Sequence, residues 1–193
     1  PRELGIDLLS LSGHKLGGPP GVGALVRSDA ALTLAPQLHG GGQQGGLRAG
    51  SLPVPLIVGL GEAVTLALAD REERQQRLGA LRDQLWRRLE AIGGIHRNGA
   101  ASPRLAHNLN VWVDGVDGAA LHSRLRRRLA VSSGSACSAG EPSHVLQALG
   151  LSRQQAAASI RFGLGADTTA EEIAEAADLV EEAVKELRQG PTR

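Results

Sequence analysis

The feature that most constrains how this chain folds is a long proline-free stretch near its middle. No proline occurs between residues 56 and 92, and apolar side chains recur there at intervals of three or four residues, interrupted by the polar run DREERQQR. That spacing places the apolar positions on one face of a helix: Leu60, Val64, Leu68, Leu78, Leu81, Leu85 and Leu89. We expect a long helix, ending at Gly93-Gly94, that connects two parts of the chain.

Shorter segments of alternating type flank this helix. Before it, residues 4–11 predict a buried strand and residues 22–26 a second short strand, each followed by a Gly-rich loop. After it, the pattern predicts strands over 109–113 and 158–162, helices over 119–129 and from Ser143 to Gly150, and a final helix opened by the capping box Thr169-x-x-Glu172. This order predicts an α/β fold in which residues 1–70 end one domain and residues 71–193 form a small α/β domain.

Composition and charge exclude several classes of protein. The net charge is +1, which gives no drive towards nucleic acid, and no run of 18 apolar residues is present to span a membrane. The single cysteine, Cys137, forms no internal disulfide, so we expect a reducing compartment, the cytoplasm. The histidines lack the spacing of metal ligands, so no intrinsic metal site is predicted. Because the sequence contains no methionine and starts inside an apolar segment, we expect a fragment of a longer protein.

Basic residues are almost all arginine, with 19 Arg and only two Lys. Lys15 lies in the run Ser12-Gly13-His14-Lys15, which is followed by LGGPPGVG. A P-loop would place its lysine after the glycines and just before a helix, whereas Lys15 precedes them and a strand follows. Two interpretations stay open from the residues alone. Lys15 is either a solvated side chain in a tight turn or an amine aimed into a cleft, for chemistry that a guanidinium cannot perform.

A second glycine-rich loop, GGGQQGGLRAGS, covers residues 40–51. A flexible linker is one interpretation, but linkers built from Gly and Ser lack an embedded arginine such as Arg48 and lack flanking apolar runs. Backbone N–H groups in a loop of this kind form a nest that binds anions. The loop is therefore a candidate anion-binding segment.

Two further segments carry side chains suited to chemistry. Cys137 follows the run SGSA, whose small residues leave a thiol accessible, as a thiolate nucleophile requires, although a lone cysteine is often a small buried hydrophobe. Arg161 lies in the run SIRFG at the end of a predicted strand. Arg161 is either a charged side chain on the surface or a guanidinium group that binds a carboxylate through two hydrogen bonds.

Together, these four segments resemble in order and spacing the NifS/IscS-like cysteine desulfurases, pyridoxal-phosphate-dependent members of the class-V aminotransferase family. The resemblance runs from Leu4 to about Leu187. It implies the aminotransferase type I fold, with the end of the large-domain sheet, a connecting helix and the small domain present here. It also implies that Lys15 carries pyridoxal 5'-phosphate, with Ser12 and His14 at the cofactor phosphate.

The same resemblance assigns roles in the other segments. Ser51 would reach across a homodimer to the partner's cofactor phosphate, with Gln43 and Arg48 supporting its loop. Arg161 would bind the α-carboxylate of L-cysteine. Cys137 would accept the substrate sulfur as a persulfide and leave L-alanine as product. The chain departs from the family pattern after Cys137, because only three residues separate it from Glu141. A shorter loop would limit how far the persulfide travels.

The implied function is a cytoplasmic transferase that passes sulfur from Cys137 to an acceptor or scaffold protein, for iron–sulfur cluster assembly or another sulfur-transfer pathway. A Cys137 persulfide would ligate a cluster only transiently. Two alternatives stay open: a selenocysteine lyase-type enzyme, and a truncated, inactive fragment that serves dimerisation or partner binding. We expect the 193 residues alone to be inactive. In this family the acid that protonates the cofactor ring precedes the lysine, and neither Asp7 nor Asp29 suits that placement.

Overall fold

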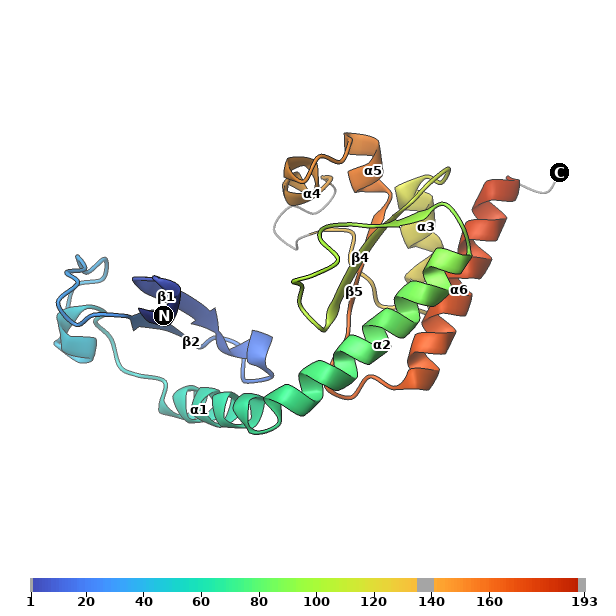
Figure 1. Ribbon diagram of the computed structural model, residues 1–193. Coiled ribbons are helices and arrows are strands. Elements are labelled where there is room, and N and C mark those ends of the chain that lie inside the picture. Colours follow the sequence, from blue (N-terminus) through green and yellow to red (C-terminus); the bar gives the residue numbers. More distant parts are fainter. Residues whose placement is uncertain (1, 135–140, 191–193) are drawn as a thin grey trace. The chain divides into compact units, whose positions relative to one another are not determined.

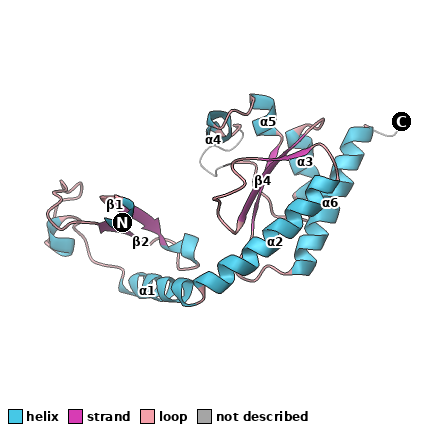
Figure 2. Ribbon diagram, viewed as in Figure 1, coloured by secondary structure: helices cyan, strands magenta, loops and turns pink. Residues whose placement is uncertain are grey.

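The computed structural model describes residues 2–134 and 141–190 of the chain. Within it the chain divides into two compact units, residues 1–71 and residues 72–193. Figure 1 traces each unit along the sequence, and Figure 2 distinguishes its helices from its strands. The boundary between the units falls at the first residue of a long helix, so each unit is described separately.

The first unit consists of one β-hairpin, three short 3-10 helices and one α-helix. Strand β1 pairs antiparallel with strand β2, with Leu8 opposite Arg27 and Ser12 opposite Gly23. A side chain at Gly23 would come within 2.4 Å of the Leu11 carbonyl oxygen, so the pair requires glycine there. The elements are η1 (Arg2–Leu4), β1 (Leu8–Ser12), η2 (Gly13–Leu16), β2 (Gly23–Arg27), η3 (Gln43–Gly46) and α1 (Val54–Ala69).

The first unit buries few of its apolar side chains. The expectation of a buried strand over residues 4–11 is wrong in this respect, because Leu8 and Leu9 on β1 are exposed, as is Leu25 on β2. A two-stranded hairpin covers too little surface to bury its own side chains. Among the described residues of this unit, the buried ones are Gly13, Leu60 and Ala63, where η2 packs against α1.

The second unit is built on a three-stranded antiparallel sheet with strand order β3-β4-β5. Leu109, Val111 and Val113 of β4 face a core that also contains leucines of α2 and the apolar side of α6. Helix α2 lies beside α6, as Figure 1 shows, and the Arg88 guanidinium joins them by an ion pair to Asp178 at 2.5 Å. The elements are α2 (Arg71–Ala91), β3 (Ile95–Arg97), β4 (Asn108–Val113), α3 (Gly118–Leu125), α4 (His144–Ala148), α5 (Arg153–Ala157), β5 (Ser159–Gly163) and α6 (Ala170–Gln189).

The predicted long helix is interrupted at one residue. Helix α1 ends at Ala69 and α2 starts at Arg71, and between them Asp70 has the non-helical angles φ −121° and ψ 24°. Aspartate is a poor residue for a helix interior because its side chain competes for backbone hydrogen bonds. The helical spacing therefore identified helical structure over residues 54–91 but not the break at Asp70.

Helix starts in the second unit follow the capping signals of the sequence. The predicted box at Thr169 is confirmed: its hydroxyl accepts from the Glu172 N–H at 3.2 Å, and the Glu172 carboxylate accepts from the Thr169 N–H at 3.0 Å. Ser143 caps α4 as expected, accepting from the Leu146 N–H. Helix α5 and strand β3 were not predicted, and α3 ends at Leu125, before the predicted end at residue 129. Over the part of the chain described, no helix is both long and apolar enough to cross a membrane.

Candidate active site

The turn that carries Lys15 is fixed by its backbone. Ser12 ends β1, and the next four residues form η2. The Gly13 N–H donates to the Val22 carbonyl at 2.9 Å, and the Gly18 N–H donates back to the Gly13 carbonyl at 3.0 Å. Gly13 is buried, whereas the side chains of His14 and Lys15 are exposed and Ser12 is half-buried. The turn therefore presents a hydroxyl, an imidazole and a primary amine from neighbouring positions on a hydrogen-bonded backbone.

The second glycine-rich loop closes on itself. The Gly50 N–H donates to the Gln43 side-chain oxygen at 3.1 Å, and the Arg48 guanidinium donates to the Ala49 carbonyl at 2.8 Å. Gln43 and Arg48 thus shape the loop, and Ser51 is exposed just after it. Figure 1 shows this loop and the Lys15 turn at opposite ends of the β1–β2 hairpin. Within one chain, this loop therefore lies away from the turn that carries Lys15.

Arg161 stands on β5 in the second unit. Its neighbours Ile160 and Phe162 are buried in the core, so strand alternation turns Arg161 to the opposite face of the sheet. On that face Asn110 of β4 lies directly across from it. On its other side Ser132 forms an isolated antiparallel bridge with Arg161. The guanidinium Nη2 donates to the Ser132 hydroxyl at 3.2 Å.

A cavity of about 360 Å³ lies over this face of the sheet. Its described lining includes three basic side chains, those of Arg104, His144 and Arg161, and no aspartate or glutamate. The pKa of Arg104 is lowered, first because its guanidinium is partly buried and next because Arg82 and Arg97 are nearby. Such a lining favours an anionic ligand, since it offers positive charge without a competing carboxylate.

Asparagine side chains of the cavity lining belong to a hydrogen-bond network that the sequence did not reveal. Asn98 is only 5% exposed, and its Nδ2 donates to the Asn110 side-chain oxygen at 2.6 Å and to the Ser159 hydroxyl at 3.1 Å. Ser159 in turn donates to the Gln155 carbonyl at 2.9 Å. The side-chain oxygens of Asn98 and Asn108 are buried without a hydrogen-bond partner. The only sequence signal for the network is the alternation in NLNVWV, which places Asn108 and Asn110 on one face.

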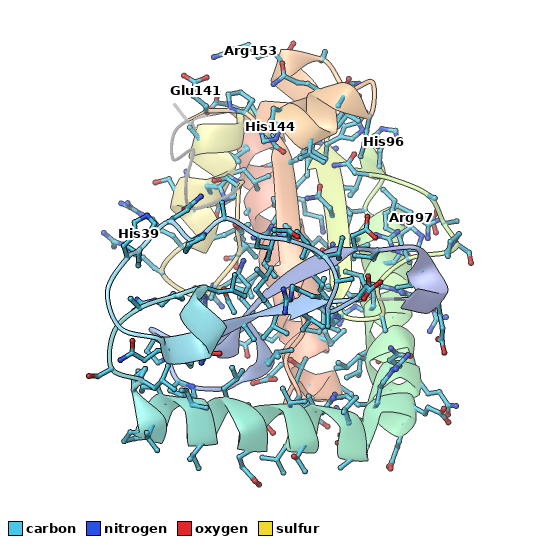
Figure 3. All side chains as sticks on the ribbon, turned by 90° about the vertical axis from the view of Figure 1, so that its left-hand side faces the viewer. His39, His96, Arg97, Glu141, His144 and Arg153 are labelled. Carbon is cyan, nitrogen blue, oxygen red and sulfur yellow. The ribbon has the colours of Figure 1, made fainter. Side chains whose placement is uncertain are left out.

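Cys137 lies outside the described residues, as does the whole segment 135–140. The residues on either side of that segment are described. Ser133 and Gly134 line the cavity next to Arg161, and Glu141 forms an ion pair with Arg153 at 2.8 Å. Figure 3 labels this pair together with His144 of α4. His39, His96 and His144 lie on separate segments, and among the described residues no three His, Cys, Asp or Glu side chains gather as metal ligands.

The predicted site residues thus fall into three places. Ser12, His14 and Lys15 share one turn of the first unit, and a separate loop of the same unit holds Gln43, Arg48 and Ser51. Arg161 is in the second unit, on the wall of the cavity.

Comparison with known proteins identifies the family. Residues 1–175 match the model of the class-V aminotransferases. This chain belongs to the class-V aminotransferase family. Among curated class-V relatives, the chain is 47% identical over 187 residues to the cysteine desulfurase IscS of Shewanella baltica strain OS223, covering 95% of this chain and 46% of the relative. It is 48% identical over 190 residues to the cysteine desulfurase IscS of Actinobacillus succinogenes, and the match covers 97% of this chain and 47% of the relative.

Solved structures agree with this assignment to the class-V family. A NifS-like protein superposes with a TM-score of 0.84 at 31% identity, over 95% of this chain and 47% of that chain. The NifS-like protein from Rickettsia africae superposes with a TM-score of 0.86 at 27% identity, and the match covers 95% of this chain and 49% of that protein. The predicted family and fold class are therefore confirmed. The chain spans about half the length of the curated relatives that it matches.

Proposed function

We propose that this chain forms part of a pyridoxal-phosphate-dependent cysteine desulfurase. In this proposal Lys15 holds the cofactor, Arg161 binds the α-carboxylate of L-cysteine, and Cys137 accepts the sulfur. The observation that carries the proposal is the turn at the end of β1, where a primary amine projects from a backbone held by two hydrogen bonds. The high identity to proteins named cysteine desulfurase supports the same assignment.

The side chains of this turn suit two parts of the cofactor. The Lys15 amine fits its aldehyde carbon, and the Ser12 hydroxyl and His14 imidazole fit a phosphate group as hydrogen-bond donors. The third requirement, an acid at the ring nitrogen, is not met nearby. Asp7 precedes β1 and Asp29 follows β2, and the Ser28 N–H bonds the Asp7 carbonyl at 2.9 Å. Both acids thus sit at the far end of the hairpin from Lys15.

The position of these acids bears on what the first unit is. We infer that residues 1–70 are the part of a larger cofactor-binding domain that carries its lysine, and that residues 71–193 form the small domain. The exposed leucines of β1 and β2 support this inference, because further strands or helices would bury them. We expect the 193 residues alone to release little or no alanine from cysteine, since Asp7 and Asp29, the acids nearest Lys15 in the sequence, lie at the other end of the hairpin.

The second unit supplies the groups that handle the substrate. A guanidinium binds a carboxylate through two parallel hydrogen bonds, and Arg161 reaches a cavity whose described lining holds no competing acid. When bound, pyridoxal phosphate acts as an electron sink at the substrate α-carbon. The Lys15 amine, once free, takes the α-proton. The Cys137 thiolate forms a bond to the substrate sulfur as the carbon–sulfur bond breaks, leaving a persulfide on Cys137 and, after protonation of carbon, L-alanine.

We further propose that the protein acts as a homodimer and passes the persulfide sulfur to an acceptor protein. The loop over residues 43–50, which the Gln43–Gly50 hydrogen bond closes, supports the dimer, because it lies at the other end of the hairpin from the Lys15 turn. In this proposal Ser51 contacts the cofactor phosphate bound by a second copy. The acceptor follows from the chemistry, since a persulfide is a carrier that must be discharged before the next turnover.

The test uses the native protein that contains this chain, supplied with L-cysteine, a reductant and cofactor. We expect equal amounts of alanine and sulfide. Cys137→Ala should keep the cofactor absorbance and lose sulfide release, whereas Ser123→Ala, an exposed control on α3, should match the native rate. An unchanged rate in Cys137→Ala would remove Cys137 as the nucleophile. Alanine formed from selenocysteine but not from cysteine would favour a lyase, and no turnover of either would favour a binding fragment.

A further inference from the structure

We propose that Ser132 is a positioning residue that sets the direction of the Arg161 guanidinium. Arg161, Ser133 and Gly134 line the cavity, and Ser132 lies behind them as the strand partner of Arg161. It is half-buried at the edge of the sheet. The inference rests on the role of Arg161 proposed above and concerns how that side chain is held ready for a carboxylate.

The backbone first brings the two residues together. The Arg161 N–H donates to the Ser132 carbonyl at 2.8 Å, and the Ser132 N–H donates to the Arg161 carbonyl at 3.1 Å. Residues that exchange both hydrogen bonds stand directly opposite each other, so their side chains project on the same face. Ser132 is 29 residues away in the sequence, and only the fold places it there.

The position of the Ser132 hydroxyl proton determines whether the hydroxyl donates to Arg161 or accepts from it. The Ser132 hydroxyl donates to the Gly134 carbonyl at 2.7 Å. A serine hydroxyl has one proton and two lone pairs, so with the proton committed to Gly134 it faces Arg161 as an acceptor. Arg161 Nη2 donates to that lone pair at 3.2 Å. A hydrogen bond to a charged donor is stronger than one between neutral groups, and it fixes the plane of the guanidinium.

This arrangement leaves the other donors of Arg161 for a ligand. A guanidinium has five N–H groups, and one of those on Nη2 is taken by Ser132. Because the same hydroxyl is bonded to Gly134, which lines the cavity with Arg161, the arginine and this part of the cavity wall are held together through one side chain. Removing the hydroxyl should let the guanidinium sample other rotamers and so weaken carboxylate binding without removing the charge.

A double-mutant cycle tests this in the native protein loaded with its cofactor. The probe is L-alanine, whose affinity is measured by calorimetry and requires no turnover. Ser132→Ala should weaken L-alanine binding about three- to tenfold, a typical loss for one charge-assisted hydrogen bond that water partly replaces. Ser132→Thr keeps the hydroxyl on a residue suited to extended backbone and should stay within about twofold of native. For cysteine turnover, Ser132→Ala should raise KM and change kcat little.

The cycle separates this inference from the proposed function. In an Arg161→Ala background, the further change to Ser132→Ala should have no effect on L-alanine affinity, because Ser132 acts only through the guanidinium. If Arg161→Ala itself leaves the affinity unchanged, the proposed role of Arg161 is wrong. If Arg161→Ala weakens binding but Ser132→Ala does not, or weakens it equally in both backgrounds, the positioning role is overturned and the proposed function stands. Matching circular dichroism spectra confirm that each variant is folded.

Discussion

Exposed leucines on helix α1 of the first unit contrast with buried leucines on helix α2 of the second. On α2 in the second unit, Leu85 and Leu89 are 1% and 0% exposed and pack against the sheet core. On α1 in the first unit, Leu66 and Leu68 are 60% and 61% exposed. Both helices lie in the stretch that the spacing of apolar residues predicted to be one long helix. The pattern indicates where a helix forms, but burial also requires a second layer, which the second unit has and the first lacks.

The same difference separates the two halves of the candidate site. Arg161 projects from a sheet whose other face is packed into the core, so its backbone position depends on many buried contacts. Lys15 projects from a turn held by hydrogen bonds next to a hairpin with exposed leucines. We therefore expect Arg161 to keep its environment in the isolated second unit, and we expect Lys15 to depend on a covering layer for a fixed environment.

The largest effect is expected when the two units are produced separately. Residues 72–193 contain the whole buried cluster and should unfold in one cooperative thermal transition. Residues 1–71 bury Leu60 and Ala63 but few other apolar side chains, and they should show no such transition. Circular dichroism during heating measures both. A cooperative transition in residues 1–71 would show that the hairpin and α1 form a sufficient core.

Next in size is the effect of removing one leucine from each helix. In the 193-residue chain, Leu89→Ala should lower the free energy of unfolding of the second unit by about 2–5 kcal/mol, because it leaves a cavity in a packed core. Leu66→Ala changes an exposed side chain and should alter stability by less than about 0.5 kcal/mol. Urea denaturation of both variants makes the comparison. Equal effects would mean that α1 is also packed in solution.

A smaller loss of folding stability is expected when a helix cap is removed. Thr169→Ala removes the hydroxyl that accepts from the Glu172 N–H at the start of α6 and should cost about 1 kcal/mol. Helix α1 starts at Val54, and its N-cap residue Pro53 forms no side-chain cap. The matched control in that helix is Thr65→Ala, because the Thr65 hydroxyl donates to the Gly61 carbonyl within the helix. That control should change stability by less than about 0.5 kcal/mol. If the two variants proved equally stable, the Thr169 cap would have no stabilising role.

The smallest effect concerns acid stability of α6. The pKa of Glu181 lies below its ordinary 4.5, first through its hydrogen bond to Lys185 and then through the charge of that lysine. A lowered carboxyl pKa stabilises the fold above the unfolded value, and this contribution is lost as pH falls through the folded pKa. Melting temperatures of native chain and Glu181→Gln, measured from pH 6 to pH 3, should therefore converge on acidification. A constant difference would show that the Glu181–Lys185 pair does not titrate with folding.

Local signals in the sequence predicted the second unit well. Alternation placed β4 and β5 correctly, and the caps at Ser143 and Thr169 marked the starts of α4 and α6. Each signal lies within a few residues of the feature it predicts. The break at Asp70 was missed because one unfavourable residue does not decide whether a helix continues. The exposure of β1 was missed because it depends on what lies over the strand.

The candidate site was predictable only as a set of separate segments. The motifs around Lys15, Arg48 and Arg161 were each recognisable by residue type. The contact of Ser132 with Arg161 and the burial of Asn98 against Ser159 join residues 29 and 61 positions apart. Such contacts result from strand pairing and no single segment encodes them.

The most direct test of the account is to find which lysine holds the cofactor in the native protein. The chain has one lysine in each unit: Lys15 on the exposed turn, and Lys185 on α6, paired with Glu181 at 2.5 Å. Borohydride reduction makes the bond between cofactor and lysine permanent, and peptide mapping by mass spectrometry then locates the pyridoxyl group. We expect the pyridoxyl group on Lys15 alone. A pyridoxyl group on Lys185, or none on Lys15 in protein that turns over cysteine, would contradict it.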